Sequence, residues 1–124
     1  VENIGPEPAE MHILYHTNFG YPLVADDTDL NLNGVPLTVG DQHTKCHPTP
    51  DRFTAEISRA GRDDWPSAKV RIEGDLPFVQ VWRDARPRRN VLAIEPSNCD
   101  RTRDGTSGPG TWLAPGETWQ AQQE

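Results

Sequence analysis

Hydrophobic and polar positions alternate along several short segments of the chain, which is the period expected of half-buried β-strands. The segment 11–17 alternates in this way, with Met11, Ile13 and Tyr15 on one side. The segment 52–58 does so more clearly, with its larger apolar residues all on one side. No segment carries a 3.6-residue apolar stripe, so the pattern predicts little helix.

Further strands are expected in the second half of the chain. The segments 69–73 and 78–82 flank turn residues at 74–77, which predicts a β-hairpin. The aliphatic segment 90–95 predicts another strand. Pro96 should end that strand, because proline donates no hydrogen bond to the ladder.

The connections are rich in turn-forming residues. Residues 25–51 hold many Asp, Asn, Gly, Pro and Thr residues, so we expect a long irregular connection with at most a short strand at 35–39. A turn at 113–117 leads into a last expected strand at 118–122. Together these segments predict an all-β fold, an antiparallel β-sandwich of about six strands. The expected core residues are Phe53, Ile57, Val70, Ile72, Val79, Val81, Leu92 and Ile94.

The length of 124 residues allows at most one domain, 1–124. A hydrophobic fraction of 34%, with 12 prolines and 10 glycines, indicates a small core and many turns. We expect the chain either to associate with itself through exposed strand edges or to form a compact sandwich of marginal stability.

The formal net charge of −7 argues against nucleic acid and anionic membranes as partners. Four arginines between positions 83 and 89 are interpreted as a solvated turn, with contact to a phosphate or carboxylate as the alternative. No apolar run of about 18 residues predicts a membrane-spanning helix. Because no segment reads as a signal peptide and two cysteines define no disulfide framework, we expect reduced thiols and a cytoplasmic location.

One short segment combines metal-binding residue types. His43, Cys46 and His47 lie within five residues, which is close for a tetrahedral zinc site, and no matching second half follows. We interpret the segment as a polar loop and predict that the protein needs no metal and no cofactor.

Glu95 is the residue with the clearest chemical potential. In a strand it shares one face with Val91 and Ala93, so its carboxylate is partly desolvated. Desolvation raises the pKa of a carboxyl group and makes it a better proton acceptor near neutral pH. The alternative is an acid at a strand end that points into water.

Three segments in a fixed order, 14–23, 82–96 and 113–117, resemble the aldose 1-epimerase (galactose mutarotase-like) superfamily. Their patterns L-Y-H-x-N-F-G-Y-P-L, W-R…V-L-x-I-E-P and L-A-P-G-E are most similar to a bacterial aldose 1-epimerase-like group with an uncharacterised family domain. The resemblance covers nearly the whole chain but only the C-terminal half of the family's domain. It implies that the sandwich is part of a larger one and that the partner is a small sugar.

The resemblance also implies a reaction, the interconversion of the anomers of an aldose by general acid and base catalysis. Glu95 matches the family's base, which accepts the proton of the anomeric hydroxyl, and His16 matches the acid at the ring oxygen. No metal or organic cofactor takes part. A second histidine and an arginine, which help to bind the sugar, belong to the family's N-terminal half.

Four further residues are expected substrate-binding residues, each with a structural alternative. Trp82 offers an aromatic face to a sugar ring, with core packing as the alternative. Asn18 and Asn98 can bond sugar hydroxyls or satisfy turn backbones, and Tyr21 can do either.

Three hypotheses remain open from the sequence. The chain is an isomerase or its catalytic half, a non-catalytic carbohydrate-binding sandwich, or an inactive fragment in which His16 and Glu95 hold a turn. Catalysis requires the two side chains to flank one sugar ring, at ~5–9 Å by analogy with paired carboxylates.

Overall fold

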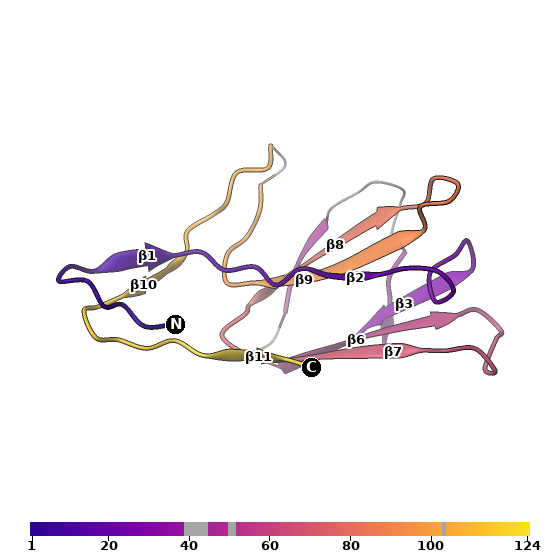
Figure 1. Ribbon diagram of the computed structural model, residues 1–124, viewed down its shortest axis with the longest axis horizontal. Helices are drawn as coiled ribbons and strands as arrows, with labels where there is room; N and C mark the ends of the chain where they lie inside the picture. The colour runs from indigo at the N-terminus through magenta and orange to yellow at the C-terminus, as the bar shows by residue number, and fades with distance from the viewer. Residues whose placement is uncertain (39–44, 50–51, 103) are drawn as a thin grey trace.

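The computed structural model describes residues 1–38, 45–49, 52–102 and 104–124, and in these it contains strands and no helix (Figure 1). The all-β prediction is therefore confirmed. No helix in the described ranges is long and apolar enough to cross a membrane. The strands are β1 (Ala9–Met11), β2 (Thr17–Phe19), β3 (Thr28–Leu32), β4 (Val35–Pro36), β5 (Lys45–Pro48), β6 (Arg52–Arg59), β7 (Ala68–Gly74), β8 (Phe78–Asp84), β9 (Val91–Ser97), β10 (Thr111–Leu113) and β11 (Ala121–Gln123).

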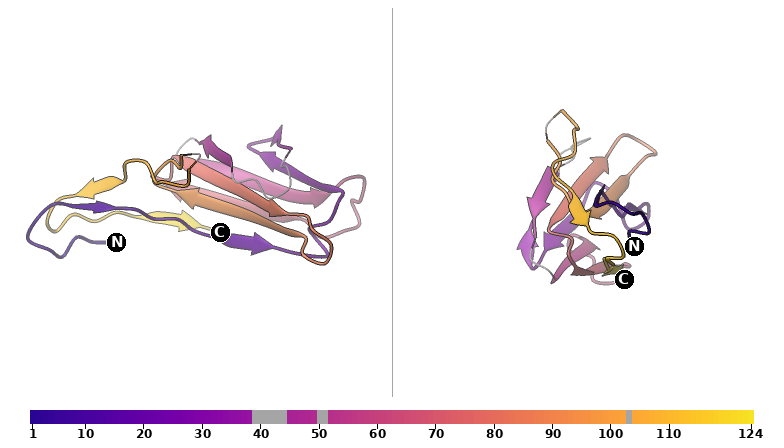
Figure 2. Two further views of the ribbon diagram at one scale, coloured as in Figure 1. Left: turned by 90° about the horizontal axis from the view of Figure 1, so that it is seen from above. Right: turned by 90° about the vertical axis from the view of Figure 1, so that its left-hand side faces the viewer.

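Two antiparallel sheets make the body of the molecule. One has the strand order β11-β7-β6-β3-β4, and the other has the order β2-β9-β8-β5. β1 and β10 form a separate antiparallel ribbon that extends from one end of this body (Figure 2). The arrangement is the predicted antiparallel sandwich, with more strands than expected.

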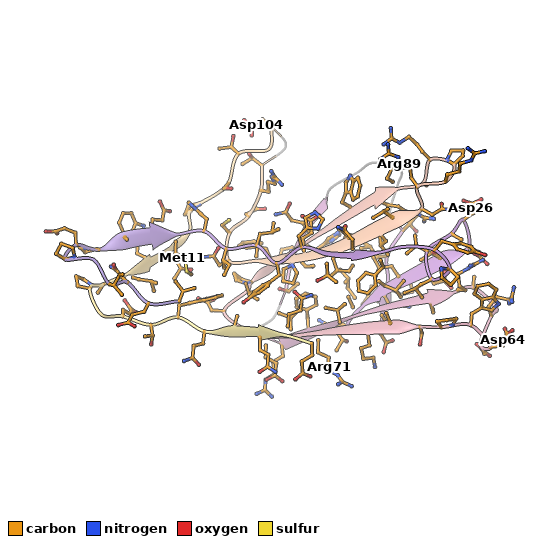
Figure 3. The ribbon with its side chains drawn as sticks, in the orientation of Figure 1. Met11, Asp26, Asp64, Arg71, Arg89 and Asp104 are labelled. Atoms are coloured by element: carbon orange, nitrogen blue, oxygen red, sulfur yellow. The ribbon has the colours of Figure 1, made fainter. Side chains whose placement is uncertain are left out.

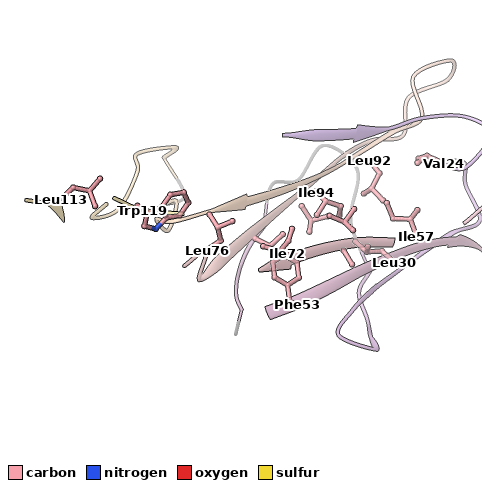
Figure 4. Packing of buried hydrophobic residues seen from close by; sticks show 14 residues of the cluster. Val24, Leu30, Phe53, Ile57, Ile72, Leu76, Leu92, Ile94, Leu113 and Trp119 are labelled. Atoms are coloured by element: carbon pink, nitrogen blue, oxygen red, sulfur yellow. The ribbon is translucent and has the colours of Figure 1, made fainter. Parts of the chain in front are cut away.

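Most of the hydrophobic core lies between the two larger sheets, and Trp119 and Leu113 extend it toward the β1–β10 ribbon (Figure 4). Each fully buried Val, Leu, Ile or Phe contributes about 1.5–3 kcal/mol to folding. The eight predicted core residues all belong to this cluster, together with Val24, Leu30, Ala55, Leu76, Leu113 and Trp119.

The predicted hairpin between the seventh and eighth strands is wrong. β7 pairs with β6 and β11, whereas β8 pairs with β9 and β5 in the other sheet. The connecting residues cross from one layer to the other, and Leu76 in this crossing is only 1% exposed. Alternation shows which side of a strand is apolar, but it does not show which sheet the strand joins.

The predicted strand at 11–17 is also wrong as one element. β1 ends at Met11 and β2 begins at Thr17, because the first pairs with β10 and the second with β9. Between them only Leu14 forms an isolated bridge, to Ser97. The side chains still alternate in exposure along this extended stretch, as the sequence pattern predicted.

In its described residues the region 25–51 holds β3, β4 and β5, where a long irregular connection with a short strand at 35–39 was expected. β4 lies within that expected short strand, whereas β3 and β5 were not expected. β3 and β4 are joined by Asn33 and Gly34, whose φ angles of 51° and 79° are those of a two-residue hairpin turn. β5 pairs with β8. The last strand, β11, begins at Ala121 rather than at 118.

Candidate functional site

The candidate site lies on the outer face of the four-stranded sheet, the face turned away from the core. β9 pairs with β2 in the register Thr17↔Ile94, so His16 stands beside Glu95 in the next position. On its other side β9 pairs with β8, which places Gln80 opposite Glu95. One row across the sheet therefore holds three polar side chains, from segments far apart in the sequence.

β9 continues past Glu95 to Ser97, so the expectation that Pro96 ends the strand is wrong. The carbonyl of Pro96 accepts a hydrogen bond from the Tyr15 amide. The amide and carbonyl of one residue in an antiparallel strand point to the same side, so the nitrogen of Pro96 also faces this side. The regular pairing of β9 with β2 ends at Ile94. The missing N–H of Pro96 therefore removes no hydrogen bond between these two strands.

His16 and Glu95 are in direct contact. The Nε2 atom of His16 lies 3.1 Å from the Oε1 atom of Glu95. The Glu95 side chain is only 6% exposed, whereas the His16 side chain is 47% exposed. Burial raises the pKa of the Glu95 carboxyl above its ordinary value, and the positive charges of His16 and Arg101 oppose that rise.

This contact is closer than the expected separation of two groups that flank a sugar ring, ~5–9 Å. That expectation is wrong for the chain without a ligand. Hydrogen bonds from O1 and O5 each span about 2.7–3.0 Å, so the pair must separate before a sugar can lie between them. Of the two side chains His16 is the less confined, because half of it is already in water.

A second histidine and glutamate on the same side of the molecule form a useful comparison. His12 lies 3.6 Å from Glu10, with side-chain exposures of 43% and 33%. The two pairs therefore differ mainly in the burial of the acid. Burial raises the pKa of Glu95, which suits a base near neutral pH.

Gln80 is a site residue that the sequence analysis missed. It is 2% exposed, and its Oε1 atom has no hydrogen-bond partner among the described residues. A buried acceptor without a partner is uncommon in a folded protein. The signal in the sequence was an amide residue between Val79 and Val81, on the outer face of an apolar strand.

Asn18 and Trp82 lie on the same face, one row along the sheet. Both are register partners of Ala93, Asn18 from β2 and Trp82 from β8. Asn18 is exposed and Trp82 is partly exposed, and neither belongs to the core cluster. The small side chain of Ala93 lies between the Asn18 amide and the Trp82 ring in this row.

Two expected substrate-binding residues remain, Asn98 and Tyr21. The side chain of Asn98 is engaged in hydrogen bonds within the protein. The Oδ1 atom of Asn98 accepts from the Ile13 amide at 2.8 Å. Its Nδ2 atom donates to the Met11 carbonyl at 2.8 Å and to the Thr111 hydroxyl at 2.9 Å. Asn98 therefore ties the chain between β1 and β2 to the residues after β9.

Tyr21 is 72% exposed. It lies beyond the Val91 end of β9, whereas Glu95 is near the other end. It follows Phe19, whose register partner is Leu92, and precedes a cis proline. The structure therefore separates Tyr21 from the His16–Glu95 pair.

No group of three or more His, Cys, Asp or Glu residues in the described ranges is arranged to hold a metal ion. His43 lies outside the described residues, and so does the side chain of Cys46. Comparisons of the chain with protein-family models, with curated proteins and with solved structures found no match.

Proposed function

We propose that this chain is a carbohydrate-active β-sandwich of the aldose 1-epimerase type, with Glu95 as general base and His16 as general acid. One observation supports the proposal most directly. The two residues that the resemblance selected, 79 positions apart in the sequence, are in contact at 3.1 Å.

The environment of the pair suits the proposed roles. Glu95 is buried, and its raised pKa makes it a stronger base than a surface carboxylate. His16 is half-exposed, so it can rotate away to admit a sugar and can exchange its proton with water. The Glu95 carboxylate would take the proton from O1 while the imidazolium gives one to O5. After ring opening and rotation of the aldehyde the two transfers reverse, so the protein ends in its starting protonation state.

Groups for binding the sugar stand beside the pair. Next to Glu95, Gln80 has an acceptor without a partner among the described residues, and Trp82 presents an aromatic face one row away. Asn18 supplies a donor and an acceptor at the exposed edge of the same face. We expect these three residues to contact the sugar, with its anomeric carbon between His16 and Glu95.

The second candidate function is a carbohydrate-binding sandwich without turnover. The closed contact between His16 and Glu95 favours it, because no space for a sugar ring exists between the two groups in this state. Trp82 and Asn18 would still bind a sugar on the outer face.

Polarimetry on freshly dissolved α-D-glucose and α-D-galactose tests the proposal, with the spontaneous rate subtracted. We expect the chain to accelerate mutarotation and Glu95→Gln to lower the acceleration by about 10²–10⁴-fold, the typical contribution of one acid or base. His16→Asn should have a similar effect. Glu10→Gln and His12→Asn are the matched controls, and both should leave the rate unchanged.

The outcomes separate the two candidates. A chain that binds sugar without accelerating mutarotation supports the binding sandwich. An acceleration that Glu95→Gln leaves intact removes Glu95 from the mechanism. Activity should also rise with pH as Glu95 loses its proton, since only the carboxylate can act as the base.

A further inference from the structure

A polar cavity lies on the side of the four-stranded sheet opposite to the His16–Glu95 pair. It has a volume of about 250 Å³ and opens between the two sheets. Figure 3 shows Asp26, which lines the cavity, at the same end of the sandwich as the turn that carries Arg89. The lining residues are Asp26, Thr28, Asp29, Leu30, Leu37, Thr38, Arg83 and Leu92.

The sheet separates this cavity from the His16–Glu95 pair. Arg83 and Leu92 are register partners, and both lie on the core side of their strands. Glu95 lies on the opposite side of β9, because side chains alternate along a strand. The cavity is therefore a different place from the proposed active site.

Arg83 supplies a hydrogen-bond donor that no described residue accepts. Its Nη2 atom donates to the Ala25 carbonyl, which fixes the guanidinium at the cavity. Its Nε atom is buried and has no hydrogen-bond partner in the part of the chain that the structure describes. An acceptor on a ligand would satisfy this N–H.

The other polar groups define what the ligand must offer. The Thr28 hydroxyl is already engaged, because it accepts from the Ala25 amide and donates to the Ala25 carbonyl. The carboxylates of Asp26 and Asp29 are exposed and have no ion-pair or hydrogen-bond partner among the described residues. They accept hydrogen bonds from a ligand, whereas Arg83 donates one.

The charges and the apolar wall narrow the ligand class. Two carboxylates and one guanidinium leave the lining negative, which disfavours an anion. A hydroxyl group both donates and accepts, so neighbouring hydroxyls can bridge Arg83 and the aspartates. Leu30 and Leu92, which point inward from the two sheets (Figure 4), suit the C–H surface of a ring.

We propose that this cavity binds a small neutral polyol through Arg83, Asp26 and Asp29. Its volume is just below the 300–1,000 Å³ or so of pockets for drug-sized ligands, so the ligand is about the size of one six-membered ring. The proposal does not depend on mutarotase activity, since it concerns the opposite face of the sheet.

The test uses myo-inositol, a cyclic polyol without an anomeric carbon, which no mutarotase can convert. The Arg83 Nε–Hε signal of ¹⁵N-labelled protein is followed by NMR during the titration. We expect a saturable shift with millimolar affinity. Asp29→Asn should weaken binding about tenfold, equivalent to the loss of about one good hydrogen bond. Asp75→Asn, which removes the same charge from an exposed position, is the matched control.

Titration of the wild-type protein needs no variant, so it stays informative whatever happens to the folding of Asp29→Asn. No saturable shift of the Arg83 signal overturns the proposal. Equal weakening by Asp29→Asn and Asp75→Asn overturns it as well, because it shows a general charge effect. Saturable shifts with acetate or ethylammonium but not with myo-inositol overturn the ligand class. Glu95→Gln should leave the titration unchanged.

Discussion

The two faces of β9 are equally buried but chemically different. Leu92 and Ile94, on the inner face, are 1% and 0% exposed and belong to the core. Ala93, Glu95 and Ser97, on the outer face, are 0%, 5% and 0% exposed. Burial alone therefore does not distinguish the packing side of this strand from the candidate functional side.

The difference lies in what burial does to each face. On the inner face it removes apolar surface from water, which stabilises the fold. On the outer face it desolvates a carboxylate and an amide, which costs free energy unless both find partners. Glu95 has His16 as its partner, while the Oε1 atom of Gln80 has none in the described ranges. Such an arrangement is expected where a site is prepared for a ligand.

Ile94→Ala should give the largest loss of stability. It removes a fully buried side chain from the centre of the core, so we expect the free energy of unfolding to fall by about 2–5 kcal/mol. Urea denaturation measures this loss. Val35→Ala, at a position 66% exposed, should change stability by less than about 0.5 kcal/mol. Equal effects of the two variants would contradict the inner face as the packing face.

Gln80→Met should raise the stability of the protein, in contrast to Ile94→Ala. It keeps a similar volume and removes a buried acceptor that has no partner among the described residues, a group that costs about 1–3 kcal/mol. We expect the free energy of unfolding to rise by about 1 kcal/mol, while sugar binding on the outer face weakens. Gln120→Met, at an exposed position, is the control. A clear loss of stability would show that the Gln80 amide has a structural role.

Much of the inner face could be predicted from the sequence. All eight expected core residues are in the core, because alternation identifies the apolar side of a strand whichever partner it finds. The same parity placed Glu95 with Ala93 on one face. The contact of His16 with Glu95 depends on the register of β2 against β9, which no local pattern encodes.

The errors have equally specific causes. β3 was missed because Leu30 stands between Asp29 and Asn31, so the strand reads as polar. The Asn33–Gly34 turn that follows it is a strong hairpin signal, and the sequence analysis overlooked it. The crossing between β7 and β8 resembles a hairpin locally. Gly74 instead lets β11 approach, since a Cβ atom there would lie 2.9 Å from the Ala121 Cα atom.

The pH dependence of stability in Glu95→Gln tests the difference between the two faces of β9. The pKa of Glu95 is raised in the folded chain, so the folded state holds the proton more tightly than the unfolded state does. The wild-type protein should therefore lose stability as pH rises from the ordinary Glu value of 4.5 through the raised pKa. Glu95→Gln should lack this loss and should melt at a higher temperature near pH 7.

Melting curves of both proteins from pH 4 to pH 8 measure this difference, and Glu10→Gln serves as the control. If the difference in melting temperature between wild type and Glu95→Gln stays constant across this range, the Glu95 carboxyl does not titrate as a buried base. A difference that narrows as pH rises would reverse the assigned sign.

Asp84→Asn should give the smallest effect on stability, and its pH dependence should be opposite in sign to that of Glu95→Gln. Asp84 is a second buried acid on the outer face, 1% exposed, and Arg86 binds it through Nε at 2.8 Å and Nη2 at 2.6 Å. These bonds lower the pKa of Asp84 to about 2. Its contribution to stability is complete above the ordinary value of 3.8 and is lost as pH falls toward 2. Asp84→Asn should therefore melt below the wild type near neutral pH and approach it in acid. Asp75→Asn should show no such convergence, and a wild-type protein that keeps its full advantage at pH 2 would contradict the role of Arg86.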